Sequence, residues 1–437
     1  MERCRLFRPE KQREVFEAIR RGGQKSYLSR GLGRSYGDAA LNAGGGLISH
    51  LRLGRLLDFD PESGLLECEA GTSLGAIIET FLPRGFFPEV TPGTRHVTVG
   101  GAIASDVHGK NHHVDGTFAS SLVSFTLLRP DGGTIVCSRG EHPELFWATV
   151  GGMGLTGPIL SARIRLRRVE TAFVRADYRR LPNLDAVLAA FDESDRSYRY
   201  SVAWIDCLAS GSSLGRAVLM QANDLAAGEV GRGRANSDPL RMPARRTLTV
   251  PFRFPSGSLN RATVGMFNAL YYRMQTERRD EIVDYDRFFY PLDALEEWTR
   301  LYGRRGFIQY QAAVPTESGL SGMRALLERL SSAGQTSFLA ILKKFGASNE
   351  GVLSFPMEGY TLALDLPNRP GLAELVRELN EITLSAGGRV YLAKDALLDR
   401  ETFERMYPRA EEFRRIKSEL DPQGLFSSSL ARRVGPA

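Results

Sequence analysis

The stretch RGLGRSYGDAALN (30–42) places Gly31, Gly33 and Gly37 within eight positions. Glycine tolerates positive φ and close backbone approach, so successive N–H groups in such a turn can converge on an anion such as a phosphate. A Rossmann turn needs G-x-G-x-x-G spacing followed directly by a helix. Here the spacing is G-x-G-x-x-x-G, and residues 44–46 are all glycine where that helix would run. The stretch predicts an anion-binding turn outside a Rossmann fold; taken alone, a tight turn without a ligand is the alternative.

Two further glycine-rich segments follow, TPGTRHVTVGGAIASDVHGKNHHVDG (91–116) and VGGMGLTG (150–157). Short strand-like runs separate the three segments. A single phosphate needs only one such turn, whereas a long ligand lying along the backbone can use all three. The pattern therefore favours an extended nucleotide-type ligand.

The motif HGKNHH (108–113) contains three of the six histidines of the chain. His108 and His112 could bind a metal if they shared one helical face. Gly109 and Asn111 argue against a helix there, and no nearby set of carboxylates and histidines completes a metal site. We expect an active-site loop without a metal; polar residues that are hydrogen-bonded within a purely structural loop are the alternative.

The elements around these motifs mix helices and strands. Segment 71–90 predicts a helix capped by Thr72 or Ser73 and ended by Pro83, with Ile77 on its buried face. From about residue 173 to 388, strands alternate with helices, for example in TSFLAILKKFG, GYTLALDL and GLAELVRELNEITLSAGG. This order predicts an α+β protein in which an antiparallel sheet carries helices on one face.

Composition limits the class of protein. The chain has 437 residues, 42% apolar and 25% charged, which is ordinary for globular protein and too long for one core. Its net charge of +6 suits an anionic ligand or weak attraction to anionic lipid, and is too small to indicate nucleic acid. The four cysteines are scattered singly, which favours a reducing compartment. We expect a cytoplasmic protein without a signal peptide or membrane span, with any membrane contact peripheral.

The order of the motifs resembles the vanillyl-alcohol-oxidase-type (VAO/PCMH) flavoproteins and, more narrowly, the decaprenylphosphoryl-β-D-ribose 2′-oxidase family. The stretches that carry the resemblance span nearly the whole chain: RGLGRSYGDAALN, TPGTRHVTVGGAIASDVHGKNHH, ELFWATVGGMGLTG, AWID, GFIQYQAAVPTE, VYLAKD and FERMYPR. The resemblance implies two domains: an FAD-binding domain in 1–172 and a substrate-binding domain in 173–388. Residues 389–437 would return to the FAD-binding domain.

The resemblance also implies a set of site residues. The first turn lacks the histidine that tethers FAD in many relatives, so the FAD would be noncovalent. Its phosphates would lie against residues 31–35, and its ring near His108 and Lys394. The residues assigned to FAD are Ser29, Arg30, Gly31, Leu32, Gly33, Arg34, Ser35, Tyr36, Gly37, Asp38, Ala39, Gly93, Thr98, Val99, Gly100, Gly101, Ser105, Asp106, Val107, His108 and Tyr391.

By the same resemblance, the catalytic candidates are Lys394, Tyr36 and His108. Oxidation of a secondary alcohol removes a hydride from carbon and a proton from the hydroxyl group. Lys394 could accept that proton with a lowered pKa, or remain charged and stabilise the developing anion. Both roles stay open at the level of sequence, and Tyr36 is the second candidate for the proton path.

The substrate residues implied are Lys110, Trp204, Gln311 and Lys343. The implied reaction is oxidation of the 2′-hydroxyl of a polyprenyl-phosphoryl-β-D-ribose to the 2′-keto sugar, with a separate NAD(P)H-dependent keto-reductase as partner. The family's asparagine and cysteine in GYTLALDL are Thr361 and Ala363 here, so the sugar contacts must differ. The alternative is an FAD-dependent oxidase of a soluble polyol or sugar lactone.

Residues 229–261 contain seven arginines against two acidic residues and are rich in glycine, proline and serine. A mobile, solvated loop is one interpretation. The other is a basic lid that meets anionic lipid headgroups, with Arg245 and Arg246 among its contacts. Two alternatives of another class are a nucleotide-binding protein without redox chemistry and a nucleic-acid binder that uses this arginine-rich segment. A nucleic-acid binder needs neither the three glycine turns nor the Lys-Asp strand end.

Overall fold

The strands and helices form sheets that border a cavity. In the computed structural model, residues 3–194, 196–230 and 238–435 are described. Near the N-terminus, a small parallel sheet in the order β1-β3-β2 packs against α1 (Gln12–Gly22). Its strands are β1 (Arg5–Phe7), β2 (Tyr27–Arg30) and β3 (Gly46–Ser49). The first glycine-rich turn leaves the end of β2.

A second, antiparallel sheet has the order β4-β5-β9-β7-β8, with β6 paired to β9. Its strands are β4 (Leu56–Asp60), β5 (Leu65–Glu69), β6 (Phe86–Pro88), β7 (Leu122–Leu128), β8 (Thr134–Ser138) and β9 (Ile159–Arg168). The helices between them are α2 (Leu74–Phe81), α3 (Val99–Ala104), α4 (His112–Asp115) and α5 (Pro143–Thr149). The predicted helix in 71–90 is α2, capped by Ser73, whose side chain accepts the N–H of Ala76.

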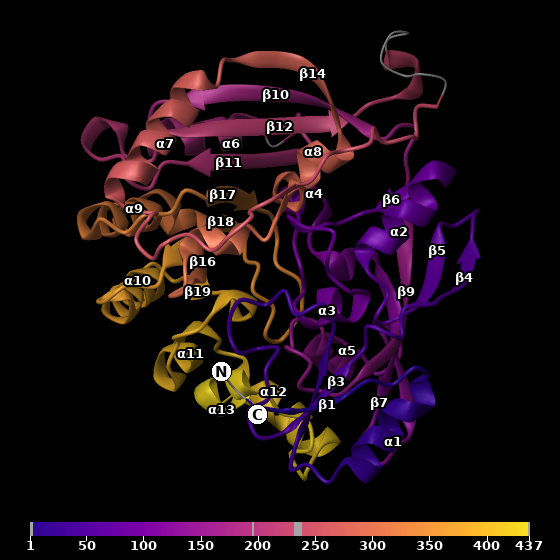
Figure 1. The fold of residues 1–437 in the computed structure, drawn as a ribbon. Helices are drawn as coiled ribbons and strands as arrows, with labels where there is room; N and C mark the ends of the chain where they lie inside the picture. Colours follow the sequence, from indigo (N-terminus) through magenta and orange to yellow (C-terminus); the bar gives the residue numbers. More distant parts are fainter. Residues whose placement is uncertain (1–2, 195, 231–237, 436–437) are drawn as a thin grey trace.

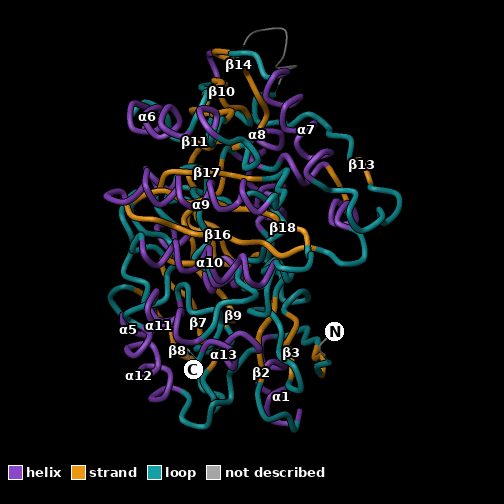
Figure 2. Tube along the Cα trace, turned by 90° about the vertical axis from the view of Figure 1, so that its left-hand side faces the viewer, coloured by secondary structure: helices purple, strands orange, loops and turns teal. Residues whose placement is uncertain are grey.

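The third sheet has eight strands, all antiparallel, in the order β14-β10-β12-β11-β17-β18-β16-β19 (Figure 1). These are β10 (Phe173–Leu181), β11 (Tyr200–Ile205), β12 (Ala217–Asp224), β14 (Arg278–Asp284), β16 (Phe307–Pro315), β17 (Ala340–Phe345), β18 (Gly359–Pro367) and β19 (Arg389–Val390). Helices α6 (Leu184–Ser194), α9 (Gly319–Ala333) and α10 (Leu372–Ser385) lie on one face of the sheet (Figure 2). The predicted antiparallel sheet with helices on one face is confirmed for these three helices, while α7 (Arg261–Met274) lies on the other side of the sheet.

Strand alternation decides which side chains of this sheet reach the cavity. In β16, Gln309 and Gln311 line the cavity, while Tyr310 is buried in the core on the other side. In β17, Lys343 lines the cavity and Leu342 belongs to the core. Successive residues of a strand point to opposite faces, so each strand contributes polar groups to the cavity without breaking the core beneath the helices.

The C-terminal segment runs back to the N-terminal sheets. After a short turn at Leu392–Lys394 come α11 (Arg400–Met406), α12 (Ala410–Leu420) and α13 (Ser429–Val434). The last of them, α13, lies next to the small N-terminal sheet (Figures 1 and 2), and Arg432 of α13 donates to the side-chain oxygen of Asn42 at 2.8 Å. Backbone hydrogen bonds hold this C-terminal segment against the N-terminal sheet: the N–H of Tyr27 donates to the carbonyl of Leu425 at 2.7 Å. β19, which begins at Arg389, pairs with β16 and so still belongs to the eight-stranded sheet. The domain boundaries at 172/173 and 388/389 remain a prediction.

Candidate active site

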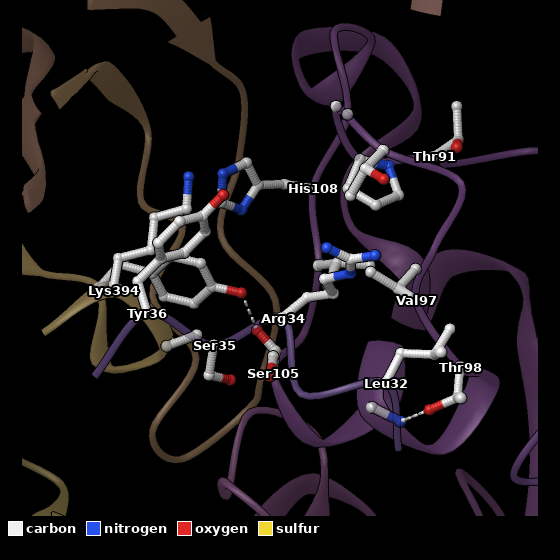
Figure 3. A pocket seen from close by; sticks show the side chains of 18 of the residues that line it. Leu32, Arg34, Ser35, Tyr36, Thr91, Val97, Thr98, Ser105, His108 and Lys394 are labelled. Atoms are coloured by element: carbon white, nitrogen blue, oxygen red, sulfur yellow. Dashed lines mark hydrogen bonds between the residues drawn. The ribbon is translucent and has the colours of Figure 1, made fainter. Parts of the chain in front are cut away.

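The cavity, of about 420 Å³, lies between the first two glycine-rich segments and the open face of the eight-stranded sheet. Its size falls within the usual range of small-molecule sites. In Figure 3, Lys394 and Tyr36 lie together on one side, and His108 extends toward them from the other. The amine nitrogen of Lys394 is 6.0 Å from the centre of the Tyr36 ring. Chain segments more than 350 residues apart thus face one another here.

The first glycine turn has the properties of an anion nest. In the described part of the chain, no backbone N–H of residues 31–35 has a protein acceptor, and all five residues line the cavity. A Cβ on Gly31 would lie 2.1 Å from the hydroxyl of Thr98, and Gly33 has a φ of 63°. Only glycine permits this close packing of the first turn on the second. The free amides and the bare backbone fit the diphosphate of a dinucleotide.

His108 is buried beside the sheet and hydrogen-bonded from it. The side-chain amide of Gln311 donates to Nε2 of His108 at 3.0 Å and lies 3.0 Å from the hydroxyl of Thr361. Burial, followed by the charges of Lys343, His112 and Lys394, lowers the pKa of His108 well below its usual value, so its imidazole is neutral. With Nε2 accepting, the proton sits on Nδ1.

Two polar atoms of this network have no partner among the described residues: Nδ1 of His108 and the side-chain oxygen of Gln311. Buried polar atoms are normally hydrogen-bonded. One unpaired donor and one unpaired acceptor at the cavity wall therefore fit a ligand with both kinds of group, such as a flavin ring or a sugar.

Three half-buried lysines line the same space, Lys110, Lys343 and Lys394. Burial lowers the pKa of Lys110 to about 7. Burial, and then the charges of the other two lysines, lower the pKa of Lys343 to about 7. Lys110 donates to the carbonyl of Phe288 and lies 4.4 Å above that ring. Holding several partly desolvated ammonium groups close together is unfavourable until an anion enters, so the arrangement fits a phosphate.

Lys394 differs from the other two lysines because a carboxylate acts on it. Burial lowers the pKa of Lys394 to about 8, and the charge of Asp365 partly opposes that shift. Asp365, in β18, is fully buried and accepts the side-chain amide of Gln309 at 2.6 Å. Burial raises the pKa of Asp365 to about 6. A lysine whose pKa lies close to neutral can exchange a proton with a substrate hydroxyl.

Arg433 of α13 fixes the segment that carries Lys394 onto the first turn. Its guanidinium bonds Asp38 at 2.6 and 2.9 Å and Asp395 at 2.8 Å. In the same place, the N–H of Tyr36 donates to the carbonyl of Ala393 at 2.9 Å. Gly37 packs so closely that a Cβ would lie 1.6 Å from the carbonyl oxygen of Asp395. Together these contacts set the position of Lys394 relative to the nest.

Most of the predicted site residues line the cavity. They are Ser29 to Tyr36, Ala39, Gly93, Thr98, Gly100, Gly101, Ser105, Val107, His108, Lys110, Gln311, Lys343, Tyr391 and Lys394. Their roles toward FAD and substrate remain proposals. The hydroxyl of Tyr391 donates to the carbonyl of Ser105 at 2.6 Å, so Tyr391 also joins the second glycine segment to the C-terminal return.

Five predicted site residues lie outside the cavity wall. Gly37 and Asp38 belong to the contact with Asp395 and Arg433 described above. Val99 is buried in the core, and Asp106, at a φ of 41°, bonds Asn349 at 2.7 Å.

Trp204 is the fifth of these residues. Its side chain leaves the same face of β11 as that of Val202. Val202 lines the cavity, whereas Trp204, two residues further along the strand, does not, and its indole N–H donates to the carbonyl of Phe338 at 3.0 Å.

The sequence interpretation missed Asp365, Gln309 and Arg433. Asp365 could have been found as the one charged residue in the apolar strand GYTLALDL. The arginine-rich segment also differs from a free lid: Arg245 donates to the carbonyls of Asp286, Tyr290 and Pro291, which borders the cavity. Residues 231–237 of that segment lie outside the described residues. In the described part of the chain no histidine, cysteine or carboxylate cluster forms a metal site.

Comparison with known proteins agrees with this geometry. Residues 5–138 match the FAD binding domain family, and residues 360–434 match the D-arabinono-1,4-lactone oxidase family. The decaprenylphosphoryl-beta-D-ribose oxidase of Mycolicibacterium smegmatis is 41% identical over 424 residues, covering 97% of this chain and 92% of that protein.

Two further relatives differ in how near they are. A protein of Streptomyces coelicolor named "Uncharacterized protein in mprA 5'region" is 37% identical over 373 residues, covering 83% of this chain and all of that protein. The L-gulonolactone oxidase of Scyliorhinus torazame is 23% identical over 465 residues, covering 98% of this chain and 94% of that protein. The lactone oxidases are thus the more distant relatives.

The glycine turns, the cavity and the FAD-binding match define a two-domain flavoprotein of the VAO/PCMH type, an FAD-dependent oxidoreductase. Within that class, the chain belongs to the decaprenylphosphoryl-β-D-ribose oxidase family.

Proposed function

We propose that this enzyme oxidises the 2′-hydroxyl of a polyprenyl-phosphoryl-β-D-ribose to the 2′-keto sugar, as the first step of epimerisation to an arabinose donor for cell-envelope glycans. The relative at 41% identity is named for a decaprenylphosphoryl ribose. The observation that carries the proposal is the set of three half-buried lysines around one cavity, because a free polyol or lactone has no charge for them to neutralise.

FAD, when bound, supplies the acceptor for the hydride that leaves the sugar carbon. The chain's own residues perform the remaining tasks. Residues 31–35 hold the diphosphate through backbone amides. Lys394, with its lowered pKa, takes the hydroxyl proton, and Asp365 sets the charge around it. His108 and Gln311 bond the ring or the sugar through their unpaired atoms, and Lys110 and Lys343 hold the phosphate.

Further parts of the proposal rest on chemistry outside the chain. The 2′-keto product must be reduced to complete an epimerisation, which calls for a separate NAD(P)H-dependent keto-reductase. A lipid-linked substrate calls for contact with a membrane surface, and we place the enzyme at its cytoplasmic face. No helix among the described residues has the length and apolar character to cross a membrane.

The function is tested by adding candidate substrates to the purified flavoprotein without oxygen. A short-chain polyprenyl-phosphoryl ribose should bleach the visible flavin band, while xylitol and L-gulono-1,4-lactone should leave it unchanged. Bleaching by the lactone or polyol, and none by the phosphoryl ribose, would assign the enzyme to the soluble-sugar oxidases instead.

Replacing Lys343 by glutamine should raise the KM for the phosphoryl ribose by about ten- to a hundredfold with little change in kcat, because a charge-assisted contact to the phosphate is lost. Lys344→Gln is the matched control. Its side chain leaves the opposite face of β17 and pairs with Asp192 at 2.7 Å. Steady-state kinetics of both variants decide the point, and an equal effect in the control would contradict it.

The pH profile follows from the lowered lysine pKa values. A proton acceptor must be neutral, so kcat should rise with pH and level off above the Lys394 pKa of about 8. Over the same range the affinity for substrate should fall, because Lys110 and Lys343, with pKa values of about 7, lose the charge that binds phosphate. A kcat that declines through pH 8 would instead make Lys394 a cationic stabiliser.

A further inference from the structure

Helix α7 (Arg261–Met274) carries a row of large apolar side chains that no part of the described chain covers. Met266, Leu270 and Met274 are 70%, 56% and 69% exposed. They stand four residues apart and so lie on one face of the helix. Leu248 and Phe252, just before the helix, are 70% and 61% exposed. We call these five residues the α7 face.

The opposite side of α7 is firmly attached to the sheet. Val264 and Asn268 are buried, and the side-chain amide of Asn268 donates to Asp206 at 2.7 Å. The ring of Tyr271 contacts Trp204 at 4.7 Å between centroids. The exposure of the α7 face therefore follows from the way the helix is docked.

The chain segment that carries the α7 face is basic, and Glu296, bonded to Thr249, lies at its edge. Residues 239–276 contain six arginines and no lysine, aspartate or glutamate, so this short segment carries a charge equal to the net charge of the entire chain. Arg253 and Arg273 are exposed among the apolar residues. Basic residues interleaved with exposed apolar ones are the combination that binds anionic lipid at the headgroup level.

The face adjoins the apolar end of the cavity. Val202, Leu339 and Ile341 line that end, and Phe338, next to Leu339, contacts Phe267 of α7 with centroids 6.1 Å apart. Figure 2 shows α7 and the loop of β13 (Leu248–Thr249) on the side of the eight-stranded sheet that lacks α6 and α9. Resting on the function proposed above, this position lets a polyprenyl tail pass from a bilayer into the cavity.

We infer that the α7 face docks the enzyme on an anionic lipid bilayer, with Leu248, Phe252, Met266, Leu270 and Met274 among the acyl chains and Arg253 and Arg273 at the headgroups. A second copy of the chain is a poor occupant, because a two-fold contact through this face would bring arginines against arginines. An anionic bilayer satisfies both the apolar and the basic groups of the face.

The test is sedimentation of the full-length holoenzyme with vesicles. Binding to vesicles of equal parts phosphatidylglycerol and phosphatidylcholine is expected at low salt, with weak binding to phosphatidylcholine alone. The triple variant Met266→Ser, Leu270→Ser and Met274→Ser should lose at least about tenfold in partition coefficient, since three apolar side chains no longer insert. The pair Arg253→Gln and Arg273→Gln should lose about fivefold per arginine, and high salt should mimic that loss.

Matched variants elsewhere on the surface serve as controls. Leu6, Leu51 and Leu57, which are also exposed, are replaced by serine, and Arg20 and Arg21 by glutamine; both sets should bind vesicles like the parent. Oxidation of a soluble short-chain substrate should be unchanged in all variants, which separates docking from the proposed activity.

Two results would overturn the inference. One is equal vesicle binding by the parent and the triple variant. The other is absence of vesicle binding together with a dimer, seen by light scattering, that the triple variant abolishes.

Discussion

Replacing Lys394 by methionine is expected to lower kcat for the phosphoryl ribose by about 10²- to 10⁴-fold while FAD stays bound. Of the three lysines that line the cavity, Lys394 is the one whose amine lies over the ring of Tyr36. Burial lowers the pKa of Lys394 to about 8. Because burial disfavours its charged form, the unbranched apolar methionine should not lower the thermal midpoint. Rapid-mixing reduction of the flavin and the absorbance ratio of flavin to protein measure both effects.

Two companion variants make this result specific. Lys394→Arg keeps a positive charge but cannot accept a proton near neutral pH, so it should fall nearly as far as the methionine variant. Lys25→Met, a change near the start of β2, should behave like the parent enzyme. More than a tenth of parental turnover in Lys394→Met would remove the lysine from the proton path.

The second large effect is expected from Arg433→Ala, which removes the cation between Asp38 and Asp395. Asp395 is 4% exposed, and the variant would leave its carboxylate buried without its charged partner. Loss of one partner from such a buried pair costs about 3 kcal/mol or more of the free energy of unfolding. The variant should therefore unfold at lower temperature, retain FAD weakly and turn over slowly, because the turn that carries Lys394 is no longer held on the nest.

The matched control is Arg405→Ala, which removes an exposed ion pair to Glu381 at 4.0 Å. An exposed pair of that kind contributes about 0–1 kcal/mol, so stability and FAD content should barely change. Thermal unfolding followed by flavin fluorescence compares the two variants. Equal stability of Arg433→Ala and Arg405→Ala would show that the contact of Arg433 does not position the site.

Much of the cavity could be predicted from the sequence because its backbone elements carry local signals. The glycine turn at 31–37 and the alternating strands of the eight-stranded sheet are visible in residue type and spacing alone. Lys394 could be placed there only by resemblance, since nothing local indicates that residue 394 meets residue 36.

The remaining features depend on tertiary contacts. Arg433 is one of 57 lysines and arginines, and its partners, Asp38 and Asp395, lie far from each other in sequence. Trp204 lies on the face of β11 expected for a substrate residue, but its indole N–H donates to the carbonyl of Phe338 instead. From the sequence, Arg245 is expected to be solvated, but in the structure its guanidinium donates hydrogen bonds to three backbone carbonyls. Partners of this kind follow from the fold and have no pattern along the chain.

In the proposed enzyme, one cavity holds the flavin on the amides of residues 31–35, with Lys394 beside the reacting sugar carbon. Anaerobic rapid mixing of the holoenzyme with short-chain polyprenyl-phosphoryl ribose, carrying hydrogen or deuterium at the 2′ carbon, tests it most directly. We expect the flavin band to bleach in a single turnover, more slowly with deuterium, and hardly at all in Lys394→Met. Bleaching at the same rate with both isotopes and in the variant would contradict it.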